Sequence, residues 1–328
     1  MTDQTDWRQR QLDTALELLN EGQTAFQRGD VDTADDVTEE ALAILEMAEA
    51  EGMDDELRRL RVRGLNDRGL FFQHRDAPDQ ARPFHHRAAE VLEEVEEMGG
   101  EQFEASAVAV YLNLAQVCIF DEQYAEAREA TDHGMELVAD LLDRSVPGAV
   151  SLALGLYQNK TAVESYTGNF DEAIEVADKA IELAEQLMEK GEPAALGQAA
   201  RVCQQLSVQL FEAERYDDAL EWGRRAEEYS EEAYNHIGEQ ALHLYIVSQI
   251  NLISYYEELE QFADAEDCLW KAIDVAGPDP EIIERGQMFY QQCQKYADKR
   301  LEKGNLPRDE VEMGAEDLEE LARDAGLA

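Results

Sequence analysis

Apolar residues recur at intervals of three and four positions along most of the chain, in stretches of roughly 18 to 22 residues. This spacing places apolar side chains on one face of an α-helix. Glycine, proline and short polar clusters separate the stretches, at 29–30, 52, 76–79, 99–100, 121–123, 147–148, 168–169, 191–193 and 277–280. No segment shows the convincing alternation that is typical of a β-strand. We therefore expect an all-α protein.

One motif occurs six times within this pattern. It begins with a small or polar turn residue, which is followed by an apolar residue two positions later and, in turn, by an alanine. The last two motif positions, which are mostly small residues, lie four and seven residues after that alanine. The copies are Gly29-Val31-Ala34-Thr38-Ala41, Asp76-Pro78-Ala81-His85-Ala88, Glu122-Tyr124-Ala127-Thr131-Gly134, Gly168-Phe170-Ala173-Ala177-Ala180, Glu214-Tyr216-Ala219-Gly223-Ala226 and Glu260-Phe262-Ala265-Leu269-Ala272. The anchoring alanines are 47 residues apart once and 46 apart four times, which indicates a tandem helical repeat.

The stretch from Gly168 to Leu183 resembles the turn and second helix of a tetratricopeptide repeat. An aromatic residue after the turn fills the space between paired helices, and alanines let the helices approach closely. The resemblance extends over about residues 10–279 and implies helix pairs that stack into a superhelical solenoid. The repeats are longer than the ~34 residues usual for the family, and the usual Trp is missing, as is the Pro in most units. Long-helix members, such as kinesin light chain or peptide-sensing regulators, look nearer.

We expect six antiparallel helix pairs in residues 1–279 and a capping helix in 280–304. Residues 305–328 are expected to form an acidic linker and a short helix from about 315 to 325. The apolar face of that last helix predicts docking on the repeats, with a frayed tail as the alternative. Pro83 lies inside a predicted helix, so we expect that helix to begin late.

A row of amide side chains is the strongest candidate site. The resemblance implies that the first helix of each pair lines the concave surface, and one position there is occupied by Asn20, Asn66, Asn113, Asn159, Gln205 and Asn251. Asn inside a helix costs ~0.5 kcal/mol or more relative to Ala, so its recurrence needs a reason. A primary amide offers both a donor and an acceptor to the backbone of an extended peptide. A similar row binds ligand backbone in some peptide-binding members of the family. Alternatively, the amides bond between neighbouring helices.

Other residues flank this row. Gln116 and Arg201 are polar groove positions, and Tyr166 is expected to clasp a ligand side chain. We find no nucleophile elbow, phosphate loop or zinc-protease helix, and the histidines lack the spacing of a metal site. The sequence therefore predicts a non-enzymatic adaptor that holds a peptide or protein, without cofactor or metal. The alternatives are a self-association scaffold that uses the outer face, a peptide-sensing regulator and, least favoured, an enzyme.

The charge of the chain is extreme. It has 74 acidic and 28 basic residues, a formal net charge of −46, and only seven of the basic residues are Lys. This composition resembles that of proteins from salt-in halophilic archaea, where molar salt screens the repulsion; the alternative is an acidic mesophilic scaffold. Nucleic acid is not an expected partner, because its phosphates are bound mostly by Lys and Arg.

The sequence also predicts a cytoplasmic location. The first eleven residues do not resemble a signal peptide, and we find no apolar run approaching the ~18 residues that span a bilayer. We therefore expect no membrane partner. Cys118, Cys203, Cys268 and Cys293 form no Cys-x-x-Cys pair and lie in helical apolar patterns, so we expect reduced thiols in the core.

Overall fold

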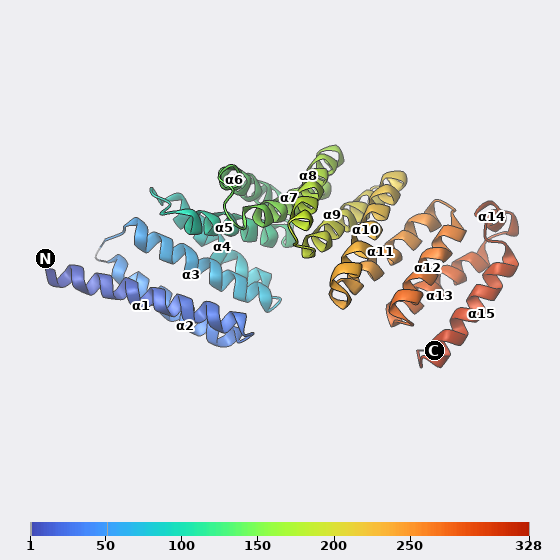
Figure 1. Ribbon diagram of the computed structural model, residues 1–328, viewed down its shortest axis with the longest axis horizontal. Helices are drawn as coiled ribbons and strands as arrows, with labels where there is room; N and C mark the ends of the chain where they lie inside the picture. Colours follow the sequence, from blue (N-terminus) through green and yellow to red (C-terminus); the bar gives the residue numbers. More distant parts are fainter. Residues whose placement is uncertain (1, 51, 328) are drawn as a thin grey trace. The chain divides into compact units, whose positions relative to one another are not determined.

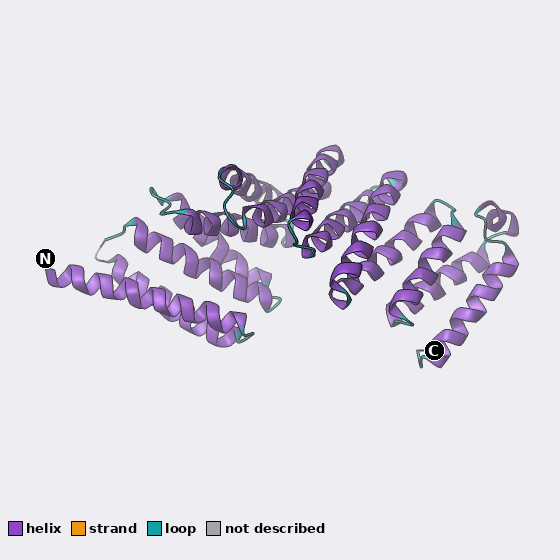
Figure 2. Ribbon diagram, viewed as in Figure 1, coloured by secondary structure: helices purple, strands orange, loops and turns teal. Residues whose placement is uncertain are grey.

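The protein is described by a computed structural model that covers residues 2–50 and 52–327, and the regular structure in those ranges is entirely helical (Figure 2). Its fifteen described helices are labelled in Figure 1: α1 (Thr2–Gln27), α2 (Val31–Glu49), α3 (Asp55–His74), α4 (Pro78–Glu93), α5 (Glu101–Phe120), α6 (Tyr124–Asp143), α7 (Ala149–Tyr166), α8 (Phe170–Glu189), α9 (Ala194–Glu212), α10 (Tyr216–Ile237), α11 (Glu239–Glu258), α12 (Phe262–Ala276), α13 (Pro280–Lys295), α14 (Asp298–Lys303) and α15 (Arg308–Asp324). The all-α prediction is confirmed.

The chain divides into two compact units, Met1–Val163 and Glu164–Ala328, and the boundary lies within α7. In the first unit the packed pairs are α1 with α2, α3 with α4, and α5 with α6. In the second unit they include α9 with α10, α11 with α12, and α13 with α15. The first helices of successive pairs also touch, since α3 contacts both α1 and α5. We call α1, α3 and α5 the first-helix layer of the first unit.

The same turn reverses the chain between the helices of each predicted pair. The six residues that begin the repeated motif all have positive φ: Gly29 (82°), Asp76 (53°), Glu122 (58°), Gly168 (79°), Glu214 (60°) and Glu260 (57°). After the turn, the next N–H donates five residues back, as from Asp30 to the Ala25 oxygen at 3.0 Å. This bond closes the last helical turn and satisfies a carbonyl that would otherwise lack a partner.

The anchoring alanines fill the contact between helices. Ala34, Ala81, Ala127, Ala173, Ala219 and Ala265 are all fully buried. A methyl side chain lets two helix axes approach more closely than a larger side chain would. The repeated alanine thus fixes how each second helix lies against its neighbours.

The C-terminal segment forms an additional helix pair, made by α13 and α14 with α15. Its turn repeats the others, because Asn305 has φ 60° and the N–H of Leu306 donates to the Leu301 oxygen at 3.1 Å. The first helix is split where Tyr296 and Ala297 adopt extended backbone angles. The sequence shows no alanine anchor here, since Val311 stands 46 residues after Ala265. That substitution explains why this pair was not recognised from the repeated motif.

Two expectations about this segment change. Helix α15 begins at Arg308, so the predicted start near residue 315 is wrong. The single capping helix expected in 280–304 is two helices, α13 and α14. The tail is docked, because Val311, Leu318 and Ala322 are buried in the same apolar cluster as residues of α11, α12 and α13.

Two further predictions in the first unit need correction. Helix α4 begins at Pro78, so the late start expected from Pro83 is wrong, and Pro83 lies inside the helix. Helix α5 is long and apolar enough to cross a membrane by length and composition, which the sequence reading overlooked. Half of the apolar stretch within this helix is buried in the protein, and the helix packs against α3, α4 and α6. Its apolar character suits a core helix with neighbours on several sides.

Candidate functional site

The predicted amide row lies on the first helices of both units. Asn20, Asn66, Asn113 and Asn159 are on α1, α3, α5 and α7, whereas Gln205 and Asn251 are on α9 and α11 of the second unit. Exposure differs along the row. Asn20 is exposed, Asn66 is half-buried, and Asn113 and Asn159 retain only 9% and 5% exposure. Gln205 and Asn251 are half-buried.

The two buried asparagines bond to neighbouring first helices. Asn113 Nδ2 donates to Asn66 Oδ1 at 3.0 Å, which joins α5 to α3. Asn159 Nδ2 donates to the main-chain oxygen of Leu112 at 3.0 Å, which joins α7 to α5. These contacts are the helix-to-helix bonds of the alternative interpretation. Contact between the row and a ligand remains a prediction.

His85 extends this polar network into the core. It is fully buried, and its Nδ1 lies 3.1 Å from Asn66 Oδ1 while its Nε2 lies 3.2 Å from Gln73 Oε1. Burial lowers its pKa to about 4, so the ring is neutral at physiological pH. Gly69 makes room for the ring, because a Cβ there would lie 2.4 Å from His85 Cε1. The network therefore ties α4 to α3 beneath the amide row.

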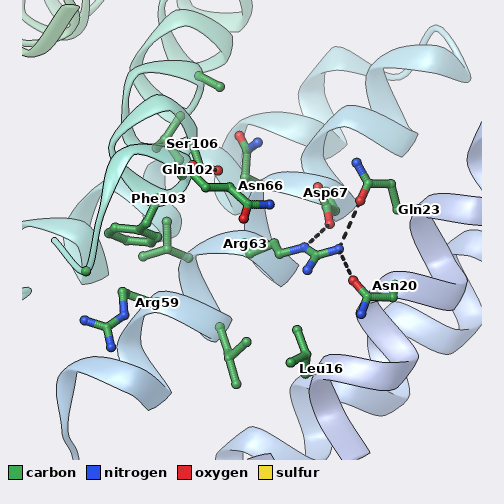
Figure 3. Close-up of a pocket in the computed structure, with 15 residues that line it drawn as sticks. Leu16, Asn20, Gln23, Arg59, Arg63, Asn66, Asp67, Gln102, Phe103 and Ser106 are labelled. Carbon is green, nitrogen blue, oxygen red and sulfur yellow. Dashed lines mark hydrogen bonds and ion pairs between the residues drawn. The ribbon is translucent and has the colours of Figure 1, made fainter. Parts of the chain in front are cut away.

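A pocket of about 540 Å³ opens on the first-helix layer of the first unit (Figure 3). Its lining residues come from α1, α3, α5 and the loop before α5: Leu16, Asn20, Gln23, Arg59, Leu60, Val62, Arg63, Asn66, Asp67, Gly99, Gln102, Phe103, Ser106, Ala109 and Val110. Two members of the amide row, Asn20 and Asn66, thus lie at one cavity. Amides, a hydroxyl and guanidinium groups share the lining with aliphatic and aromatic side chains, a mixture typical of ligand pockets.

Arg63 occupies the centre of this pocket, between α1 and α3 (Figure 3). Its Nη2 donates to Asn20 Oδ1 at 2.9 Å and to Gln23 Oε1 at 3.0 Å. Its Nε lies 3.7 Å from Asp67 Oδ2. The guanidinium therefore bonds to neutral amide oxygens and has a carboxylate only at a longer distance.

Asp67 is unusual among the acidic residues of this chain. Burial raises its pKa from 3.8 to about 6, although the charge of Arg63 acts in the opposite direction. Within the part of the chain that the structure describes, its Oδ2 is buried without a hydrogen-bond partner. The Asp67 carboxyl group is therefore protonated in a minor fraction of the molecules near neutral pH.

The start of α3 and the loop before α5 position Arg59. Asp55 accepts hydrogen bonds from the N–H groups of Glu96 and Glu97, at 3.3 and 2.8 Å, and the bond from Glu97 lowers its pKa. The loop held in this way presents the Glu97 oxygen, which accepts from Arg59 Nη1 at 2.8 Å. Gly99 has φ 77°, and a Cβ there would lie 2.8 Å from the same nitrogen. The positive φ favours glycine at this position, and a larger side chain there would also displace the end of the Arg59 side chain.

The remaining predicted residues are not gathered at this pocket. Gln116 on α5 is exposed, as are Arg201 on α9 and Tyr166 at the end of α7. In the second unit a different amide joins first helices. Gln204 Nε2 donates to the Leu244 oxygen at 2.7 Å and to Ser248 Oγ at 2.8 Å. The sequence predicted the adjacent residue, Gln205, for the row, whereas Gln204 makes the bonds between first helices.

The sequence reading also missed Arg59, Arg63 and Asp67. A usable signal was present, since five of the 21 arginines lie in the 20 residues of α3. A concentration of basic side chains in so acidic a chain is a departure from the background. The acidic composition of the whole chain masks this local excess of basic residues.

The chemistry available elsewhere is limited. Among the described residues, no group of three or more His, Cys, Asp or Glu side chains has the geometry to hold a metal ion. The four cysteines are buried, and burial raises the thiol pKa of each to about 12. Thiols with such pKa values are protonated at neutral pH and are poor nucleophiles.

Solved structures with a similar fold include a protein described as having a tetratricopeptide repeat sensor and one described as a nuclear import adaptor. The apo form of RapI matches with a TM-score of 0.55 and 18% identity, over 88% of this chain and 75% of RapI. A signal-transduction ATPase with a tetratricopeptide repeat sensor, from Pyrococcus horikoshii, matches with a TM-score of 0.52 and 15% identity, over 98% of this chain and 47% of that protein. The S. pombe nuclear import adaptor Nro1 matches with a TM-score of 0.52 and 10% identity, over 91% of this chain and 99% of Nro1. The tetratricopeptide-like fold is therefore confirmed.

Comparison with curated proteins finds no match. One family model does match, over residues 139–323, which is more than half of the chain. The matched segment runs from α6 to α15 and so includes the C-terminal helix pair, whereas the pocket around Arg63 lies before it. The chain belongs to the family described as a family of unknown function, DUF6483.

Proposed function

We propose that this protein is a non-enzymatic adaptor that holds an extended peptide, or an extended segment of a partner protein, against its first helices. The observation that carries this proposal is the pocket on the first-helix layer. Three consecutive first helices contribute to it, and its lining combines amide groups, guanidinium groups and apolar side chains. An extended peptide presents the matching features: backbone donors and acceptors at regular intervals, with side chains between them.

The fold supports an adaptor more than an enzyme. A similar fold is found in Nro1, which is described as a nuclear import adaptor. The raised pKa values of the buried thiols disfavour cysteine nucleophiles.

In this proposal the amide row has two roles. Asn113 and Asn159 hold neighbouring first helices together, and the more exposed Asn20 and Asn66 face the ligand at the pocket. The amide groups of Asn20 and Asn66 offer the donors and acceptors that suit the extended peptide backbone which the row was predicted to bind. Contacts from Gln205, Asn251, Arg201, Gln116 and Tyr166 to the ligand belong to the same proposal. We also propose that the protein acts in the cytoplasm, in a medium of high salt that screens its charge of −46.

Selection of peptides tests this function. A library of random heptapeptides is selected against the full chain in about 1 M KCl, where the Debye length is ~3 Å and non-specific attraction is suppressed. Enriched peptides are then crosslinked to protein that carries a photoreactive side chain at Gln102, an exposed residue of α5 that lines the pocket. The control carries it at Glu136, an exposed residue of α6. We expect crosslinks from position 102 and few from 136. No enrichment, or crosslinks mainly from 136, would contradict the proposal.

A further inference from the structure

A second hollow of the first unit, of about 130 Å³, is lined from two second helices, α4 and α6. Four Glu and two His side chains of these helices contribute to it, together with the buried Tyr111 and Leu114 of α5. Ala89 and Ala130 complete the lining, and their short side chains leave space between α4 and α6. We call it the α4–α6 hollow. Its described lining residues all differ from those of the pocket around Arg63.

Two of the four carboxylates in the α4–α6 hollow are paired with arginines. Glu126 Oε2 accepts from Arg82 Nη2 at 2.5 Å, and Glu90 Oε2 accepts from Arg87 Nη1 at 2.6 Å. The other oxygen of Glu126, Oε1, is buried without a hydrogen-bond partner in the part of the chain that the structure describes. His86 Nε2 lies 3.6 Å from it. One acceptor in the hollow is therefore left unsatisfied.

Glu93 and Glu129 are the other two carboxylates. Both are exposed, and within the described ranges neither forms an ion pair. Glu93 is on α4 and Glu129 on α6, so negative charge without a counter-ion is present on both sides of the hollow. A cation in a partly enclosed hollow is attracted more strongly than one at an open surface, because less solvent screens the charges. Exposed carboxylates are common in so acidic a chain, so this pair alone does not define a site.

Tyr111 is an independent feature of the same hollow. The residue lines the hollow but is only 8% exposed, and none of the described residues forms a hydrogen bond with its hydroxyl group. A buried phenol normally has such a partner. The Tyr111 ring lies 5.4 Å from the ring of His133, and the two planes are tilted by 31°. A hydroxyl group and two aromatic rings are therefore available to a group that enters the hollow.

We propose that the α4–α6 hollow binds the guanidinium group of an arginine side chain on a partner protein. A guanidinium has five N–H donors directed along different edges, which suits a hollow with carboxylates on both sides and a phenol between them. Its flat face also stacks on aromatic rings, which Tyr111 and His133 supply. The ammonium group of Lys has no such face. The site lies on second helices, so the inference does not rest on peptide binding by the first helices.

Capped tripeptides test this chemistry. N-acetyl-Gly-Arg-Gly-amide carries one guanidinium and no carboxylate, and its citrulline analogue has nearly the same shape without the charge. Each is titrated into the full chain at a constant ionic strength of about 0.3 M, and the ring C–H NMR signals of the six histidines are followed. We expect the signals of His86 and His133 to shift and saturate, and those of His236 and His243 in the second unit to stay unchanged. The citrulline peptide should bind about tenfold more weakly or worse.

Variants of the protein assign the shifts to the hollow. Glu129→Gln should weaken binding of the arginine peptide by about fivefold to tenfold and leave the citrulline peptide unchanged. Glu175→Gln is the matched control and should change neither, because Glu175 is exposed and stands at the same motif position, two residues after the anchoring alanine of the next repeat. The two variants have the same net charge. Tyr111→Phe should weaken the arginine peptide by about twofold to threefold, with circular dichroism to verify the fold.

Three results would overturn the proposal. Equal shifts with the arginine and citrulline peptides would show that the charge is not recognised. Equal weakening by Glu129→Gln and Glu175→Gln would show that the overall acidity of the chain attracts the peptide. No shift at His86 or His133 up to about 20 mM peptide, which would fill a millimolar site, would exclude binding. None of these results bears on the first-helix pocket, which the selection of heptapeptides tests separately.

Discussion

Asn113 donates its amide N–H to the amide oxygen of Asn66 at 3.0 Å, so one member of the predicted row binds the next. Both side chains come from first helices, and Asn113 is 9% exposed. Asn66 Oδ1 also faces the buried ring of His85. The row is therefore part of the packing between repeats, whatever it binds in addition.

Replacement of Asn113 by Ala tests this structural role. The change removes a donor from a buried network, and we expect the free energy of unfolding to fall by ~1 to 3 kcal/mol. Gln116→Ala, at an exposed position of the same helix, should stay within about 0.5 kcal/mol of the wild type. Urea unfolding without ligand measures both. An Asn113→Ala protein as stable as the wild type would contradict the structural role and favour an amide kept for ligand alone.

Asp67 should make the protein less stable at neutral than at acidic pH, through its own titration. Its pKa is about 6 in the folded protein and 3.8 without the shift, so between these values the folded state holds a proton that the unfolded chain has released. Its contribution is most favourable below pH 3.8 and is lost as the pH rises through 6. Asp67→Asn should therefore stabilise the protein by roughly 1 to 3 kcal/mol at about pH 7.5 and hardly at all at about pH 4.

His85 titrates with the opposite sign in an overlapping range. Its pKa is lowered from 6.5 to about 4, so the unfolded chain binds a proton there that the folded protein does not. Stability from this group is present above pH 6.5 and is lost as the pH falls towards 4. The stability of Asp67→Asn should consequently fall more steeply than that of the wild type on acidification. Parallel curves from chemical unfolding across this range would contradict the assignment.

Two glycines inside first helices should respond differently to alanine. At Gly69 the added Cβ would meet the His85 ring at 2.4 Å, and that ring is fully buried. Gly69→Ala should therefore cost about 1 to 3 kcal/mol. At Gly197 the nearest atom is Leu244 Cδ1 at 3.4 Å, so alanine fits there with its better helix propensity. Gly197→Ala should be neutral or add up to about 1 kcal/mol in thermal unfolding, and equal losses at both sites would refute this account.

The docked C-terminal helix should contribute to the stability of the second unit. Leu318 is 1% exposed and lies in the apolar cluster of that unit, whereas Met313 on the same helix is 58% exposed. Leu318→Ala should lower the free energy of unfolding by about 2 to 5 kcal/mol. Met313→Ala should change it by no more than about 0.5 kcal/mol. Similar, small effects of the two changes would show that α15 does not remain docked in solution.

Salt should stabilise the whole chain. With 74 acidic residues and a net charge of −46, repulsion between carboxylates opposes the folded state, and ions screen it. We expect the melting temperature, followed by helical circular dichroism, to rise between about 0.1 and 3 M KCl. NaCl at the same ionic strength should act similarly if screening is the cause. An unchanged melting temperature would remove the argument for a halophilic protein.

The sequence alone determined the helical class and the positions of the repeated turns. Both are local properties. Apolar spacing of three and four residues defines a helix face, and the six motif residues from Gly29 to Glu260 mark turns closed by a bond between residues five positions apart. The buried alanines follow from the same period, because each lies at a fixed distance from its turn.

Tertiary structure decided which side chains meet across helices. The bond from Asn113 to Asn66 joins residues 47 apart, and the bond from Arg63 to Asn20 joins residues 43 apart. Helix period places such residues on one face but does not decide which neighbour each amide binds. The raised pKa of Asp67 likewise depends on burial between stacked helices, which no local pattern records. The sequence therefore located the layer of first helices, and the packing of those helices brought Arg59, Arg63 and Asp67 to one pocket within it.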